Sequence, residues 1–193
     1  MKTLLVTGGI GSGKTLVCDY LQNNYVPVYN SDERTKQLYD RHPEIVTRLE
    51  EALGEPLHGE DGRLDRRRLA AIIFSDPEKR RTVEDIVHPL VREDFDRWCA
   101  GQEYELVAME AAAALESEAF RDAFDAVILV TSPLEERIKR VAARDGLSEE
   151  EIRDRVDAQD FSAAEDGSAI VLRNDADIPT LHARVEDILA KFV

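Results

Sequence analysis

Five short apolar runs recur along the chain, and segments with a helical spacing of apolar residues separate them. Within each run the apolar residues are nearly continuous rather than alternating, which is typical of strands covered on both faces. Strands that alternate with helices predict a parallel sheet with right-handed crossovers, so we expect an α/β sandwich with one five-stranded parallel sheet. The predicted strands are Thr3 to Thr7, Val26 to Tyr29, Leu106 to Met109, Ala126 to Thr131 and Ala169 to Leu172.

The interval between the second and third runs, about residues 32–101, is too long for a simple crossover. It indicates several helices with a polar turn near residues 54–62, and is therefore a candidate helical insertion. Apolar residues from Val83 to Trp98 keep helical spacing. Pro89 is expected to kink or break that helix at His88.

Capping signals mark helices in the second half of the chain. Ser132 and Ser148 are each followed three residues later by a glutamate, which is the spacing of a capping box. The last helix is expected to follow Asp177. Its apolar stripe predicts a side that faces the core, formed by Leu181, Val185, Ile188, Leu189 and Phe192.

The composition of the chain restricts the functions that it can have. With 193 residues, 43% of them hydrophobic, the chain fits one ordinary domain with an insertion. Its formal charge of −15 opposes binding to a nucleic-acid backbone, and any anionic ligand must meet local positive charge. Two cysteines are too few for a disulfide framework, and no apolar run approaches a membrane span. We expect a cytoplasmic protein with no nucleic-acid or membrane partner, either a monomer or a weak homo-oligomer.

The segment TGGIGSGKT, residues 7–15, lies between the first predicted strand and a helical pattern. It matches the phosphate loop G-x-x-x-x-G-K-[ST], in which glycines let backbone N–H groups converge on phosphates beside a helix N-terminus. Lys14 adds a mobile positive charge, and Thr15 offers a hydroxyl to Mg²⁺. The predicted nucleotide-binding residues are Gly9, Ile10, Gly11, Ser12, Gly13, Lys14 and Thr15.

A phosphate loop alone does not distinguish kinases from switches or motors. A guanine-nucleotide switch would carry an Asn-Lys-x-Asp motif, but the nearest segment, residues 174–177, reads NDAD and lacks the lysine. A motor would usually end a hydrophobic strand in paired acids, whereas the third strand here ends in the single carboxylate of Glu110.

The second strand runs into Asn30, Ser31 and Asp32. Because the carboxyl ends of parallel strands share one edge, Asp32, the phosphate loop and Glu110 are expected to converge on one crevice. A carboxylate there can accept a proton from an acceptor hydroxyl or bind Mg²⁺, as phosphoryl transfer to an alcohol requires. The alternative is that Asp32 simply caps the helix that begins at Glu33.

Arg137, Arg140 and Arg144 are spaced three and four residues apart, so they share one helix face. Arginines over a phosphate loop can neutralise charge on the transferred group. The alternative is a solvated face paired with Glu135, Glu136 and Glu151. The run from Arg66 to Arg68 is likewise either a phosphate-binding spot or a solvated helix start.

Four segments together resemble the dephospho-coenzyme A kinase family over nearly the whole chain. Beyond the phosphate loop, the combination of Phe74 with His88 and Pro89, and the arginine-rich segment that ends in Gln159, are more particular than the loop itself. The segments are TGGIGSGKT, PVYNSDERTKQL, LDRRRLAAIIFSDPEKRRTVEDIVHPLV and ERIKRVAARDGLSEEEIRDRVDAQ.

The resemblance implies a P-loop kinase fold with three parts in one domain of residues 1–193. These are an ATP core (about 1–31, 102–135 and 166–193), a helical acceptor-binding region (about 32–101) and a lid (about 136–165). It implies transfer of the γ-phosphate of ATP to the ribose 3′-hydroxyl of dephospho-coenzyme A, with Mg²⁺.

The family's functional residues can be carried over one by one. Lys14 and Thr15 match residues that hold ATP and Mg²⁺, and Asp32 matches the catalytic acid near the acceptor hydroxyl. The remaining matches are Arg140 and Arg144 as lid arginines, Arg66 and His88 in the acceptor-binding region, Glu110 at the acceptor pocket and Asn174 near the adenine.

The chain departs from the family pattern in three places. It reads Asn30-Ser31-Asp32 for Asp-Ala-Asp, alanines from Ala111 to Ala114 for a bulkier Pro-Leu-Leu segment, and Ser168-Ala169 for Ala-Asp. The alanines leave a kinase for another small alcohol or nucleotide as an alternative. A non-catalytic sensor of ATP or coenzyme A is an alternative of a different class.

Overall fold

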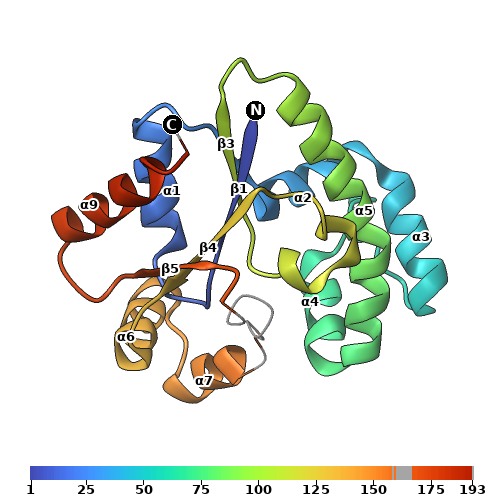
Figure 1. Ribbon diagram of the computed structural model, residues 1–193. Coiled ribbons are helices and arrows are strands. Elements are labelled where there is room, and N and C mark those ends of the chain that lie inside the picture. The colour runs from blue at the N-terminus through green and yellow to red at the C-terminus, as the bar shows by residue number, and fades with distance from the viewer. Residues whose placement is uncertain (158, 160–166, 193) are drawn as a thin grey trace. The chain divides into compact units, whose positions relative to one another are not determined.

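A parallel five-stranded sheet forms the centre of the first of two units into which the chain divides (Figure 1). In this computed structural model, all residues are described except 158, 160–166 and 193. The first unit comprises Met1–Tyr29 with Gln102–Val193, and the second comprises Asn30–Gly101. The lid predicted for residues 136–165 lies partly outside the described residues.

The strand order is β2-β3-β1-β4-β5, so the first strand is central. β1 pairs in parallel with β3 and β4, and β4 pairs in parallel with β5. This arrangement confirms the predicted α/β class and brings segments that follow β1, β3 and β4 to one edge. The strands are β1 (Lys2–Thr7), β2 (Val28–Asn30), β3 (Leu106–Glu110), β4 (Ala126–Thr131) and β5 (Ile170–Arg173).

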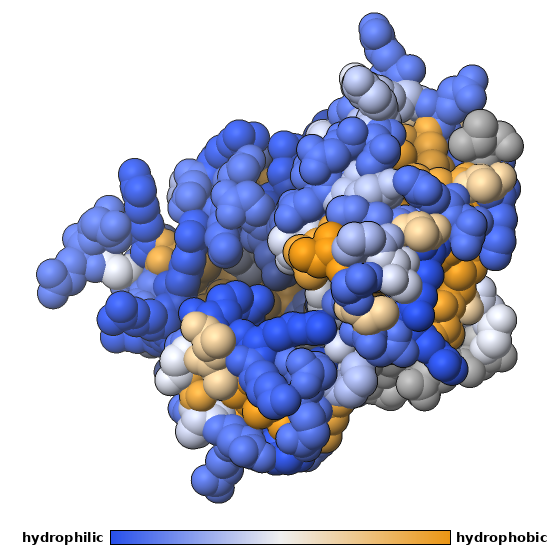
Figure 2. Space-filling view, turned by 90° about the vertical axis from the view of Figure 1, so that its left-hand side faces the viewer, coloured by the Kyte–Doolittle hydropathy of each residue, from blue (hydrophilic) through white to orange (hydrophobic). Residues whose placement is uncertain are grey.

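Continuous burial of the central strand explains its unbroken apolar sequence. Leu4, Leu5 and Val6 are fully buried, as in a strand whose two faces are both covered. Helices α1 (Lys14–Asn23) and α9 (Ile178–Leu189) contribute to the same core cluster. The side on which they lie in Figure 1 is mainly hydrophilic, with hydrophobic side chains in separate patches (Figure 2).

Helices α6 (Leu134–Asp145) and α7 (Glu149–Asp157) follow β4 in the first unit. Their buried residues Ile138, Val141 and Ile152 form a small cluster against which Ile10 packs. The capping box predicted at Ser148 is confirmed. The Ser148 hydroxyl accepts from the Glu151 N–H, and the Glu151 carboxylate accepts from the Ser148 N–H. Two short 3₁₀ helices, η1 (Ala114–Glu116) and η2 (Glu118–Phe120), follow β3.

The second unit is a group of four helices around an apolar core. They are α2 (Ser31–Arg41), α3 (Pro43–Leu53), α4 (Arg66–Ser75) and α5 (Pro77–Ala100). Gly54 ends α3 with a left-handed φ of 66°, which glycine adopts without strain. The core includes Leu38, Val46, Leu49, Leu69, Val83, Val87, Val91 and Phe95.

Of the kink or break predicted at Pro89, the break is wrong, because α5 runs through it from Pro77 to Ala100. Proline removes one backbone hydrogen bond and crowds the preceding turn. Val83, Val87, Val91 and Phe95 are nevertheless buried on both sides of it. Burial of this stripe outweighs the local cost of proline, as tertiary packing often outweighs propensity.

Both cysteines are free and buried, and burial raises the pKa of the Cys99 thiol to about 11. Within the part of the chain that the structure describes, no helix is long and apolar enough to cross a membrane.

Candidate nucleotide-binding site

The loop from Gly8 to Thr15 connects β1 to α1 and is built on close approaches that only glycine permits. Gly8 and Gly13 have φ values of 144° and 101°, where side chains are strained. A Cβ on Gly8 would lie 2.2 Å from the Val130 carbonyl oxygen, and one on Gly13 would lie 2.1 Å from Asn174 Nδ2. The loop therefore delivers its N–H groups and the N-terminus of α1 to the carboxyl edge of the sheet, a favourable place for an anion.

Two polar side chains of the loop suit a phosphate ligand. Lys14 Nζ donates hydrogen bonds to the carbonyl oxygens of Gly8 at 2.7 Å and Gly9 at 3.3 Å, so its charge lies over the loop. Ser12 is only 1% exposed, and its hydroxyl has no hydrogen-bond partner among the described residues. Since buried hydroxyls are rarely left unpaired, this orphaned group fits a loop made to hold a polar ligand.

Thr15 and Glu110 meet at the carboxyl ends of two neighbouring strands. The Thr15 hydroxyl donates to Glu110 Oε1 at 3.2 Å, and the register places Glu110 opposite Val6 at the end of β1. Burial, followed by the nearby Glu110 carboxylate, raises the pKa of the Cys18 thiol, which keeps that thiol neutral. A hydroxyl beside a carboxylate is an oxygen pair of the kind that Mg²⁺ prefers.

Arginines from α6 supply positive charge to the loop. Arg137 Nε donates to the Ile10 carbonyl oxygen at 2.8 Å, and Arg140 Nη1 donates to that of Gly11 at 3.3 Å. Burial lowers the pKa of Arg137, although a guanidinium stays charged in proteins. The Ile10 N–H also donates to Gln159 Oε1 at 2.8 Å. In a chain of charge −15, this is the local positive environment that an anionic ligand needs.

Asn174 supports the phosphate loop through a buried hydrogen bond. It follows β5 and is 4% exposed, and its Nδ2 donates to the Ser12 carbonyl oxygen at 2.8 Å. Its own carbonyl oxygen accepts from the Ser132 hydroxyl, which in turn accepts from Arg140 at 3.1 Å. The ends of β4 and β5 are thereby joined to the phosphate loop.

Replacing Asn174 with alanine is expected to weaken nucleotide binding more than it weakens the fold. The Ser12 carbonyl would lose its buried donor, at a cost of about 1–3 kcal/mol, and the loop would lose its support at Gly13. We expect a several-fold higher KM for ATP and a lower melting temperature, measured by initial rates and calorimetry. Asn24→Ala is the control, since that exposed amide donates to Tyr20 O, four residues earlier in the chain, rather than to the loop. An unchanged KM in folded Asn174→Ala protein would contradict this role.

Comparison with known proteins gives the family. The sequence model described as dephospho-CoA kinase matches residues 3–180. The chain belongs to the dephospho-CoA kinase family. A dephospho-CoA kinase of Porphyromonas gingivalis is 42% identical over 160 residues, which cover 83% of this chain and 78% of that protein. One from Shouchella clausii is 33% identical over 190 residues, which cover 96% of each.

Solved structures agree with the fold. A crystal structure from Thermus thermophilus has a TM-score of 0.84 and 33% identity, and covers 100% of this chain and 98% of that one. Dephospho-CoA kinase from Campylobacter jejuni has a TM-score of 0.64 at 20% identity, with 99% and 97% covered, which supports the fold alone. As a member of this family the chain is a kinase.

Within the first unit, the structure brings together several of the residues predicted from sequence. Arg144 is not among them, because its guanidinium forms two hydrogen bonds of 2.7 Å with the neighbouring Asp145 and is exposed. Its predicted nucleotide contact stays a prediction. The residues that meet at the loop are Lys14, Thr15, Glu110, Arg137, Arg140 and Asn174.

Asp32 lies in the second unit, in the first turn of α2, and is exposed. The alternative that it caps this helix is wrong, since Asn30 is the N-cap and its side chain accepts from the Glu33 N–H at 2.9 Å. Among the described residues, the Asp32 carboxylate has no hydrogen bond or ion pair. Its convergence with the phosphate loop stays a prediction.

The two acceptor-binding residues implied by the family also lie in the second unit. Arg66 forms an ion pair with Asp40 at 3.0 Å and donates to the Lys36 carbonyl oxygen. His88 is half-buried in α5, and burial lowers the pKa of its imidazole. Their roles toward the acceptor stay predictions.

Sequence reasoning missed the contact made by Ser132. Its spacing to Glu135 predicts a helix cap, but α6 begins after Pro133 without a side-chain cap, and the Ser132 hydroxyl instead donates to Asn174 O. Its place directly after β4 is the signal that could have revealed it, because that end of the strand shares an edge with the phosphate loop. The hydrogen bond from the Ile10 N–H to Gln159 likewise has no signal in the sequence beyond the family resemblance of the segment that ends in Gln159.

Proposed function

We propose that this chain transfers the γ-phosphate of ATP to the ribose 3′-hydroxyl of dephospho-CoA, with Mg²⁺. The observation that carries the proposal is the phosphate loop with Lys14 and Arg140 over it, in a chain that the family model matches over residues 3–180. Positioning and charge stabilisation are then the main catalytic contributions.

The first unit supplies the donor side. Lys14, the loop N–H groups and the orphaned Ser12 hydroxyl would hold the phosphates of ATP, and Arg140 would neutralise charge on the transferred group. Thr15, with Glu110 beside it, would hold Mg²⁺. When bound, Mg²⁺ neutralises charge on the phosphate oxygens. Asn174 is expected near the adenine, in addition to supporting the loop.

The second unit supplies the acceptor side. The Asp32 carboxylate would accept the proton of the 3′-hydroxyl as that oxygen forms its bond to the γ-phosphorus. The bond from the γ-phosphorus to the bridging oxygen breaks, and ADP leaves with the electron pair. Arg66 and His88 would contact dephospho-CoA.

The test is an assay of the purified protein with ATP, Mg²⁺ and dephospho-CoA. We expect ADP in proportion to a product one phosphoryl group heavier, with ³¹P and ¹H spectra that place the phosphate on the ribose 3′ position. Release of ADP no faster than without acceptor would overturn the proposal.

A panel of other acceptors tests specificity, because the alanines from Ala111 to Ala114 replace bulkier family residues. Adenosine, AMP and shikimate at matched concentration are expected to give much lower kcat/KM than dephospho-CoA. A higher value for any of them would reassign the acceptor while leaving the kinase chemistry in place.

A further inference from the structure

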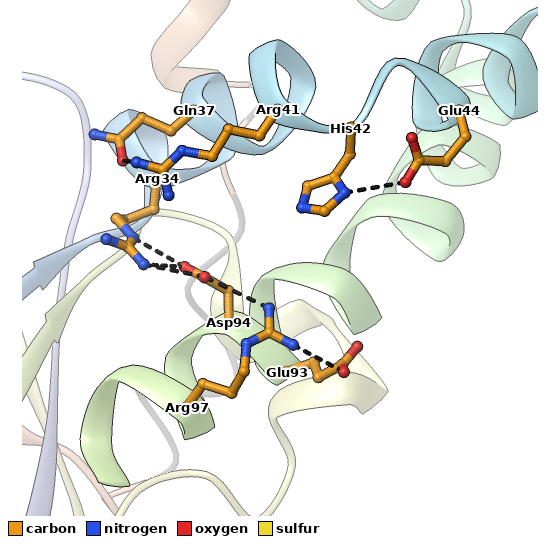
Figure 3. Close-up of polar contacts among 8 residues, drawn as sticks. All are labelled: Arg34, Gln37, Arg41, His42, Glu44, Glu93, Asp94 and Arg97. Carbon is orange, nitrogen blue, oxygen red and sulfur yellow. Dashed lines mark hydrogen bonds and ion pairs between the residues drawn. The ribbon is translucent and has the colours of Figure 1, made fainter. Parts of the chain in front are cut away.

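The second unit contains a buried carboxylate, Asp94, in the C-terminal half of α5. It is 7% exposed, and Arg34 of α2 binds both of its oxygens (Figure 3). Arg34 Nε donates to Oδ2 at 2.8 Å and Nη2 donates to Oδ1 at 3.0 Å. Arg97 approaches the same carboxylate, with Nη2 at 3.6 Å from Oδ1. The two hydrogen bonds from the Arg34 guanidinium to the Asp94 carboxylate are here called the fork. They fix the orientation of the two side chains, which a single hydrogen bond would not.

A buried ion pair is weak evidence for stability, because desolvation of both charges offsets much of their attraction. An apolar pair of similar size would often hold two helices equally well. Unlike an apolar pair, the fork fixes an orientation, since two parallel hydrogen bonds restrict the rotation of α2 about its own axis.

The place where this fork attaches is the first turn of α2. Arg34 is two residues after Asp32, and helix geometry puts side chains two positions apart about 200° apart around the axis. Arg34 therefore holds α2 on α5 from one side, while Asp32 lies on the far side of the same turn. Thr35 and the Asn30 cap also brace this turn, through hydrogen bonds to Ser31 O and from the Glu33 N–H.

The other end of α2 is held differently. Arg41 bonds to Gln37 at 3.3 Å and His42 to Glu44 at 3.0 Å, which are exposed contacts between sequence neighbours (Figure 3). The exposed Arg66–Asp40 pair joins α4 to the last part of α2. The Arg34–Asp94 pair thus differs from these in joining the turn that carries Asp32 to a buried group of another helix.

We propose that Arg34 and Asp94 are positioning residues that set the rotation of the first turn of α2, and through it the direction of the Asp32 carboxylate. The inference rests on the proposed function for the role of Asp32. Misplacement of a catalytic group by about 1 Å can cost on the order of a hundredfold in rate, so loss of the fork should reduce kcat. ATP binds through the loop of the first unit, so its KM should change little.

The decisive variant is the double replacement Arg34→Met with Asp94→Leu, which removes both charges and fills the space with apolar atoms. Such replacements often preserve stability. We expect a melting temperature close to that of the unchanged protein, a kcat lowered by about tenfold or more, and an ATP KM within about twofold. Arg34→Lys keeps the charge without the fork, and is expected to recover only part of kcat.

Lys79→Met is the matched control. Lys79 also pairs across segments of the second unit, with Glu55 at 2.9 Å, but that pair does not touch α2. This variant is expected to retain kcat within about twofold, as an ordinary partly exposed ion pair contributes little.

Hydrogen exchange gives a readout that does not depend on turnover. Amides from Glu33 to Gln37 should exchange faster in the double variant, while those of α3 and α5 should keep their protection. Normal kcat and normal exchange in the double variant would overturn the inference, as would a kcat that follows melting temperature across all the variants. If the unchanged protein fails to phosphorylate dephospho-CoA, the proposed function falls, and the exchange result still decides whether the fork holds the turn.

Discussion

Replacing Asp32 with asparagine is expected to lower kcat by about a hundredfold or more, while the KM for ATP stays within a few-fold. Asparagine matches aspartate in size but cannot take up the proton of the acceptor hydroxyl. The fold should tolerate the change, because Asp32 is exposed and Asn30 provides the helix cap. Initial rates with each substrate varied in turn, together with a thermal unfolding curve, measure both effects.

The adjacent carboxylate provides a matched control. Glu33 is exposed in the same turn, and its carboxylate pairs with Lys36 at 3.8 Å. Glu33→Gln removes the same charge one position away and is expected to leave kcat within about twofold. Near-normal turnover in Asp32→Asn would show that another group accepts the proton.

The sheet and the loop could be predicted because their signals are local. A strand buried on both faces must be apolar throughout, as Leu4, Leu5 and Val6 are, and such strands alternate with amphipathic helices in few ways. Likewise, the glycines of the loop reflect backbone conformations that other residues resist, at Gly8 and Gly13.

The errors arose where a distant partner decides the outcome. Pro89 would end an isolated helix, but residues far away in sequence bury the stripe on both sides of it. Ser132 has the spacing of a cap, but Asn174, 42 positions later, takes its hydroxyl. Asp32 and Asn30 are both good capping residues, and the difference between them depends on where the helix begins.

The arginines of α6 show what their spacing alone does not decide within the candidate site. Their spacing puts three on one face, yet a helix rises about 1.5 Å per residue, so Arg144 lies about 10 Å further along the axis than Arg137. Arg137 and Arg140 contact the loop, whereas Arg144 pairs with Asp145. Spacing predicts which side chains share one face of a helix. Which of them contact the loop depends on how far along the helix axis each one lies.

Replacing Lys14 with methionine is expected to lower kcat/KM for ATP by about a hundredfold to a thousandfold, the effect of losing one well-placed donor to developing charge. Methionine has a similar length and keeps the apolar stem, but it cannot bridge the Gly8 and Gly9 carbonyls or a phosphate. The loss of those two hydrogen bonds should also lower the melting temperature slightly. Steady-state rates and calorimetric titration with ATP measure the two contributions.

Lys139→Met separates this effect from a general loss of positive charge. Lys139 lies on α6 between the two arginines that contact the loop, and its exposed ammonium pairs with Glu136 at 2.9 Å. Since an exposed pair of this kind contributes little, kcat/KM for ATP is expected to stay within about twofold. If Lys14→Met retained kcat/KM at the level of this control, the ammonium would not serve the transferred phosphate, and the charge on Arg137 and Arg140 would have to stabilise that group instead.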